Sequence, residues 1–140
     1  MSGDTEQPLP GIEWSEPTYL PIPGEDYMVG HPAISGDSNI VVFETSTNGT
    51  DGGVGGLDLW MSERSSLDQP FSEARNLGAQ VNYFGADGCP GLSDDGLTLI
   101  FASKRLWSNK RNSDLWISRR SSRDEPFGNA ERMDVSMNSQ

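Results

Sequence analysis

The chain has 140 residues, is 34% hydrophobic, contains 16 glycines and 9 prolines, and carries a net charge of -11. This composition indicates a turn-rich globular domain with few long helices. It argues against a nucleic-acid-binding protein, which needs a basic surface, and against a membrane-spanning one, because no apolar run is long enough.

The sequence does not indicate a cellular compartment. Residues 1–10 have neither the positive start nor the apolar middle of a secretory signal. The single cysteine, Cys89, cannot form a disulfide within the chain, which fits any compartment. No Lys or Arg precedes Arg64, so the first half is acidic. We interpret this half as a solvated surface, with head-to-tail association as the alternative.

Residues 1–24 are predicted to be an N-terminal tail that carries one strand. The segment Trp14-Ser-Glu-Pro-Thr-Tyr-Leu matches Phe71-Ser-Glu-Ala-Arg-Asn-Leu, which lies one repeat further along the chain. We expect it to be the outer strand of a unit whose other strands this sequence does not contain.

The rest of the chain contains two copies of one unit, at residues 25–82 and 83–140. The stretch His31-Pro-Ala-Ile-Ser-Gly-Asp-Ser lies over Cys89-Pro-Gly-Leu-Ser-Asp-Asp-Gly, and Asp58-Leu-Trp-Met-Ser lies over Asp114-Leu-Trp-Ile-Ser. A period of roughly 57 residues is typical of a repeated supersecondary unit. The length difference between the copies falls in a loop, where insertions are tolerated.

Each unit is predicted to be a meander of four short antiparallel strands, which makes the fold all-β. The second strand is rich in β-branched and aromatic residues, a tight turn precedes it, and the outer strand is short and polar. The predicted strands are 33–35, 40–45, 57–64 and 72–77 in the first unit, and 97–103, 113–120 and 127–133 in the second.

We interpret these units as blades of a β-propeller. Trp60 and Trp116 occupy matched positions, and we expect them to pack between neighbouring blades. A propeller needs about four to eight blades, because each blade buries its apolar faces only against its neighbours. Two blades and a detached strand make an incomplete ring. We therefore expect a longer propeller, which the abrupt stop at residues 136–140 favours, with a ring of several identical chains as the alternative.

The second copy resembles the WD40-like repeat of TolB-type β-propellers. The resemblance rests on Pro90-Gly-Leu-Ser-Asp-Asp-Gly-Leu-Thr-Leu-Ile-Phe-Ala-Ser, then Asp114-Leu-Trp-Ile-Ser and a trailing Pro-Phe, and it covers nearly everything from Trp14 to Asn138. The first copy departs from it at Ser38, where glycine is expected. The resemblance implies a mostly bacterial, often periplasmic or extracellular protein. It also implies a protein-binding platform or an accessory domain beside peptidases, kinases or peptidoglycan-binding modules.

Recognition is expected on the loops at one end of the blades, at residues 21–30, 46–56, 78–88 and 104–112. The last of these loops is basic around an indole, a common composition of binding hot spots. The alternative is that the indole folds back on the blade and the charges are solvated. The candidate partner-binding residues are Trp107, Arg105, Lys110, Arg111, Asp51 and Asp87.

No set of residues in the sequence argues for catalysis or for a cofactor. No serine lies in a nucleophile-elbow context, and the paired carboxylates Asp94 and Asp95 lie in a surface turn. His31 and Cys89 begin equivalent innermost strands and can both bind a metal. Because two ligands are too few, we interpret them as ordinary lining residues.

A calcium site formed by Asp51, Asp58 and Asp87 is not favoured either, since their spacing does not match an EF-hand. Two functions remain open. We favour a non-catalytic propeller scaffold or binding module with a protein or glycan partner. The alternative is a propeller accessory to an enzyme such as a peptidase or a glycosidase.

Overall fold

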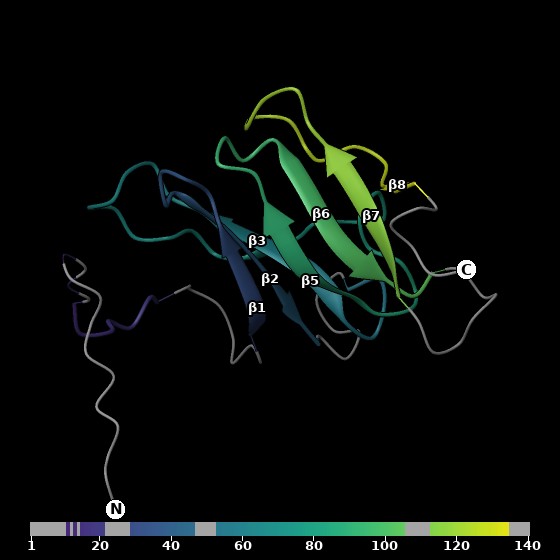
Figure 1. Cartoon of the computed structure of the whole chain (residues 1–140), viewed down its shortest axis with the longest axis horizontal. Coiled ribbons are helices and arrows are strands. Elements are labelled where there is room, and N and C mark those ends of the chain that lie inside the picture. Colours follow the sequence, from purple (N-terminus) through teal and green to yellow (C-terminus); the bar gives the residue numbers. More distant parts are fainter. Residues whose placement is uncertain are drawn as a thin grey trace, which may run out of the picture.

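Two four-stranded sheets make up the folded part of the chain. The computed structural model describes residues 11, 13, 15–21, 29–46, 53–105 and 113–134. These residues contain eight strands and no helix, in the antiparallel orders β1-β2-β3-β4 and β5-β6-β7-β8 (Figure 1). The all-β prediction with two four-stranded meanders is therefore confirmed. The two sheets do not close into a ring, and no helix of the described residues is long and apolar enough to cross a membrane.

The strands lie close to their predicted positions, and the two sheets have matching layouts. The first sheet consists of β1 (Gly30–Ile34), β2 (Ile40–Thr45), β3 (Asp58–Glu63) and β4 (Arg75–Asn76). The second consists of β5 (Asp87–Leu92), β6 (Thr98–Ser103), β7 (Asp114–Arg119) and β8 (Glu131–Arg132). The first sheet lies inside the predicted unit 25–82 and the second inside 83–140.

The outer strands β4 and β8 are much shorter than the predicted ranges 72–77 and 127–133. In the first sheet, Ser72 and Leu77 still donate backbone hydrogen bonds to Glu63 and Leu59 of β3, at 2.8 and 3.0 Å. Between them, Arg75 and Asn76 of β4 pair with Met61 and Trp60 of β3. Ala74 lies just before β4 in a buried apolar cluster.

The hydrophobic core lies between the two sheets. It combines Val42, Leu59 and Met61 from the first sheet with Leu99 and Phe101 from the second, all at most 2% exposed. Burying each such side chain contributes about 1.5–3 kcal/mol. The core therefore holds the two sheets together as one body.

A second apolar cluster lies on the opposite face of the first sheet. It consists of Val41, Phe43, Trp60, Phe71 and Ala74. Val41, Phe43 and Trp60 alternate with the core residues along β2 and β3. Trp60 therefore lies outside the core between the sheets, whereas Trp116 packs against that core. The expected packing between sheets is confirmed for Trp116 in this chain.

The sheets approach each other along one strand and diverge beyond it. The backbone of β5 lies next to β1, β2 and β3 (Figure 1), whereas β6 reaches the first sheet through the side chains of Leu99 and Phe101. A parallel bridge joins Leu57 to Ala86 at one end of this contact. Gly36 donates a backbone hydrogen bond of 2.9 Å to Asp94 at the other end. The two sheets consequently form a wedge.

The tight turn before the second strand recurs in both sheets. Ser38 and Gly96 occupy matched positions, with φ of 60° and 75°. In each turn a serine hydroxyl donates to an aspartate carboxylate, from Ser35 to Asp37 at 2.7 Å and from Ser93 to Asp95 at 2.6 Å. Serine at a left-handed position costs about 1–2 kcal/mol relative to glycine. These side-chain hydrogen bonds help to keep the turn despite that cost.

The N-terminal segment lies outside both sheets. Residues 15–21 contain no strand and are exposed, with Tyr19 at 88%. Trp14 falls outside the described residues. The outer strand expected at 14–20 would pair with a further sheet, and the two sheets of the described residues leave this prediction untested.

We expect Leu99→Ala to lower the free energy of unfolding by about 2–5 kcal/mol, because it opens a cavity in the core between the sheets. Leu67→Ala is the matched control, since Leu67 lies in a turn and is 67% exposed. Urea unfolding monitored by tryptophan fluorescence measures both variants. Equal effects of the two substitutions would contradict this account of the core.

Candidate functional site

Polar residues of the two sheets meet at three places. The loop end comprises residues 53–57, 81–86 and 104–105, which connect strands at one end of the wedge. The turn end comprises the turns 35–39, 64–71, 93–97 and 120–127 at the opposite end. The inner edge runs along β1 and β5, where the sheets are closest.

The described parts of three predicted recognition loops meet at the loop end. Gly56 donates a backbone hydrogen bond to Gly85 at 3.3 Å, and Lys104 donates one to Ala86 at 3.1 Å. A side chain at Gly55 would collide with the backbone of residues 83–85. The loops therefore pack on one another and form one continuous surface.

Arg105 and Asp87, two of the candidate partner-binding residues, form a buried ion pair at the loop end. Their Nη2 and Oδ1 atoms are 3.0 Å apart, and their side chains are 10% and 0% exposed. The second carboxylate oxygen of Asp87 accepts a hydrogen bond from the Tyr83 backbone at 2.6 Å. The pair thus joins the start of β5 to the loop that follows β6.

Aromatic rings surround the Arg105 guanidinium. It lies 4.4 Å from the ring centroid of Trp116 and 5.4 Å from that of Phe101, and its Nε donates to the Ser103 hydroxyl at 2.9 Å. It also donates to the carbonyl oxygen of Val81. With these contacts Arg105 stabilises the fold and has little surface left for a partner. The other candidate residues, Trp107, Lys110, Arg111 and Asp51, lie outside the described residues.

The loop end also exposes two neighbouring aromatic residues that sequence reasoning did not single out. Phe84 is 80% exposed and Tyr83 is 38% exposed, and their rings pack edge to face at 5.6 Å. The sequence does show two adjacent aromatic residues in the loop 78–88, which was already expected to bind a partner. Among the described residues of the loop end, these two rings therefore offer exposed apolar area.

Asp58, considered above as a calcium ligand, supports a loop instead. It is fully buried, and its carboxylate accepts backbone hydrogen bonds from Val54 at 2.6 Å and Gly55 at 3.0 Å. Asn76 donates a third hydrogen bond at 2.9 Å. Its lone pairs are directed at N–H groups, so the carboxylate orders the end of the glycine-rich loop.

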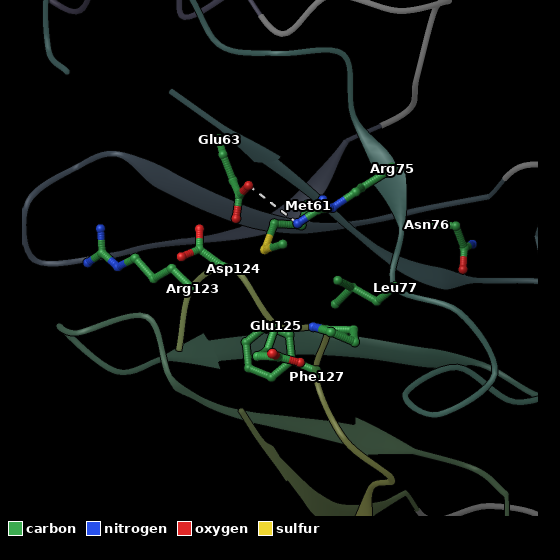
Figure 2. Close-up of a pocket in the computed structure, with 10 residues that line it drawn as sticks. Met61, Glu63, Arg75, Asn76, Leu77, Arg123, Asp124, Glu125 and Phe127 are labelled. Carbon is green, nitrogen blue, oxygen red and sulfur yellow. Dashed lines mark ion pairs between the residues drawn. The ribbon is translucent and has the colours of Figure 1, made fainter. Parts of the chain in front are cut away.

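The wedge opens at the turn end into a pocket of about 450 Å³. Figure 2 shows Met61 and Arg75 from the first sheet facing Phe127 from the second. Glu63 pairs with Arg75 at 3.3 Å, and buried Arg120 lies 3.6 Å from the same carboxylate. Burial lowers the pKa of Arg120. At the pocket wall, Glu63 and Arg75 are thus paired with each other.

An ion pair bridges the two sheets at the turn end. The Arg123 guanidinium lies 2.6 Å from the Asp37 carboxylate. This contact lowers the pKa of Asp37 below its usual range, and the Ser35 hydroxyl adds to the effect. The contact between the two turns therefore favours the charged form of Asp37.

The inner edge brings together three residues that can all bind a metal. His31 Nδ1 lies 2.6 Å from Glu44 Oε1, and the Cys89 backbone N–H donates to Glu44 Oε2 at 2.7 Å. The ligand atoms of these three side chains lie within 4.8 Å of one another. The sequence analysis matched His31 with Cys89 but did not single out Glu44. Glu44 could have been noticed as the one charged residue in a mostly apolar strand.

No protein-family model matches the chain, and no curated protein sequence matches it. The resemblance to TolB-type repeats therefore stays a prediction.

We expect Arg105→Ala to destabilise the fold by about 3–5 kcal/mol, because it leaves the buried Asp87 carboxylate without its partner. Arg75→Ala is the matched control. Its ion pair with Glu63 is exposed, and such pairs contribute about 0–1 kcal/mol. Denaturant unfolding of both variants measures the difference, and a loss below that of the control would contradict a structural role for Arg105.

The stability difference between the native chain and Asp37→Asn should shrink as pH falls. A carboxyl whose pKa is lower in the folded state stabilises the fold above its unfolded value of 3.8, and this stabilisation is lost as pH drops toward the folded value. Thermal unfolding from about pH 6 to about pH 2 tests the sign. A constant difference over this range would show that the Arg123 contact does not form in solution.

Proposed function

We propose that this chain is a non-catalytic β-propeller scaffold or binding module, whose two sheets are consecutive blades and whose loop end takes a protein partner. One observation carries the scaffold part of the proposal. One face of the first sheet packs on the second sheet. The residues at the matching repeat positions of the second sheet form a face that is only partly buried.

Equivalent residues of the two sheets differ in burial. Val42, Leu59 and Met61 are buried at 0–2% against the second sheet. Their equivalents in the second sheet, Ile100, Leu115 and Ile117, are only partly buried. An apolar face with this pattern suits another sheet of the same kind, packed as the second sheet packs on the first.

The opposite faces support the same reading. Leu99, Phe101 and Trp116 of the second sheet pack toward the first sheet. Their equivalents in the first sheet, Val41, Phe43 and Trp60, form the separate cluster on its other side. The packing is therefore head-to-tail, so further blades can be added at both ends, from the same polypeptide or from other copies of the chain.

The wedge shape favours a ring over a flat stack. Blades that approach along one inner strand and diverge toward their outer strands can be arranged around a central channel. The innermost strands β1 and β5 would then line the channel.

The loop end is the surface that we propose for partner binding. Its loops pack on a rigid scaffold, which is where recognition residues commonly lie. The ring of Phe84 is 80% exposed beside Tyr83, so it offers apolar area for a protein contact. Arg105 and Asp87 act beneath this surface by holding the loops in place.

The purified chain is expected to exceed the 15.3 kDa mass of one copy in light scattering, because its blade faces associate. Ile117→Lys should weaken this association more than about a hundredfold, since an unpaired charge would be buried at the contact, and circular dichroism should remain unchanged. Leu67→Lys, in an exposed turn, is the control and should associate as the native chain does.

The form of association distinguishes the two ways of completing a ring. A discrete oligomer supports a ring of identical chains, and open-ended aggregation supports missing blades. A stable, folded monomer would refute the proposal that these sheets are blades of an incomplete ring.

A further inference from the structure

We infer that His31, Glu44 and Cys89 form a binding site for one divalent transition-metal ion at the inner edge, with Zn²⁺ the best match. The inference does not depend on the proposed function, because it rests on side chains that the fold already brings together. Two ligands come from the first sheet and one from the second, so the ion would join the sheets where they are closest.

The donor atoms have the right types and spacing. Zn²⁺ accepts imidazole nitrogen, carboxylate oxygen and thiolate sulfur at about 2.0–2.3 Å, which puts tetrahedral ligands roughly 3.3–3.8 Å apart. In this chain the three donors lie within 4.8 Å of one another. Small side-chain rotations therefore suffice to form the site, with no movement of the sheets.

The backbone at two of the ligands has an unusual conformation. His31 has φ of 42° and Cys89 has φ of 50°, and among the described residues only Ser38 is another non-glycine residue with positive φ. Each lies at an irregularity in the pairing of its innermost strand, between Gly30 and Ala33 or between Gly88 and Gly91. Strained positions of this kind tend to occur at binding sites, because the strain aims a side chain.

Two glycines shape the space around the Glu44 carboxylate. A Cβ at Gly88 would lie 2.2 Å from Glu44 Oε2, and one at Gly30 would lie 3.0 Å from Oε1. The two glycine backbones thus let a nearly buried carboxylate, 12% exposed, sit between the strands. In the second sheet the residue equivalent to Glu44 is Ala102, so this arrangement is specific to the contact between the two sheets.

The chemistry of binding balances. The ion takes the place of the proton between His31 Nδ1 and Glu44. That proton moves to Nε2 of a neutral imidazole, or to solvent if the ring was charged, and the Cys89 thiol releases its own proton to solvent on becoming a thiolate. The thiolate and the carboxylate supply two negative charges, which neutralise a divalent ion. The side chain of His31 is 65% exposed and Cys89 is also exposed, so water can reach the fourth coordination position.

The choice of ion follows from the ligand set. A thiolate with an imidazole selects zinc and its neighbours among the transition metals, whereas Ca²⁺ and Mg²⁺ prefer sites made of oxygen alone. We therefore expect Mg²⁺ in excess to leave binding unchanged.

The test is a titration of the reduced, full-length chain with Co²⁺ and then Zn²⁺. The chain contains a single cysteine and a single histidine, so a thiolate-to-Co²⁺ charge-transfer band reports on Cys89 alone. We expect one Co²⁺ per chain, tetrahedral d–d bands of high intensity, and displacement by Zn²⁺. Zn²⁺ should also raise the melting temperature, because it binds only the folded state.

Three ligand variants and one control define the site. Cys89→Ser, Glu44→Gln and His31→Asn should each weaken Zn²⁺ binding by at least about 100-fold, since losing a residue that only orients a ligand already costs about 10–100-fold. Asparagine tolerates positive φ, so His31→Asn preserves the backbone. Glu63→Gln, at the turn end, is the matched control and should bind as the native chain does.

Several outcomes would overturn the inference. The chain could take up neither ion, or it could bind one ion per two chains. Binding could also be lost in Cys89→Ser but kept in the other two variants, and this result would indicate that the thiol binds the ion alone. If Glu44→Gln unfolds, the His31→Asn and Cys89→Ser variants still decide the question, because both residues are exposed.

Discussion

Leu99 and Phe101 of β6 lie fully buried against Val42 and Leu59 of the first sheet, and this apolar contact holds the two sheets together. Neither sheet could bury these apolar residues alone, because the apolar face of a sheet needs another layer packed against it. The contact sets the spacing and angle of the sheets. Every polar arrangement between the sheets depends on that spacing.

The three polar meeting places follow from the wedge that this contact creates. At the closed inner edge, strands of both sheets come near enough for Glu44 to reach the backbone of Cys89. At the loop end, the second sheet buries Asp87 deeply enough to require Arg105 as its partner. At the turn end, the wedge is open and leaves a pocket with paired charges. The three places thus differ in burial: the Asp87 side chain at the loop end is fully buried, whereas His31 at the inner edge and Arg75 at the turn end are exposed.

The two sheets share a backbone plan but not their chemistry. Matched turns keep the same serine-to-aspartate hydrogen bond although Ser38 replaces the glycine found at position 96. Matched second strands differ more, since Glu44 of the first sheet corresponds to Ala102 of the second. A repeat preserves the residues that define strands and turns, while positions between units are free to carry specific chemistry. The inner-edge cluster is such a position.

The sequence by itself determined the number of sheets, their four-stranded meanders and the bounds of β2, because the repeat and the alternation of apolar residues are local patterns. It could not separate the roles of Trp60 and Trp116, which depend on which face meets the other sheet. It placed Arg105 and Asp87 on a recognition surface, and only the tertiary structure made them a buried pair. It also could not predict the contact between Glu44 and Cys89, because these residues lie in different sheets and are far apart in the sequence. Local sequence patterns therefore predict where strands form. The role of each side chain depends on how deeply it is buried and on what it contacts in the other sheet.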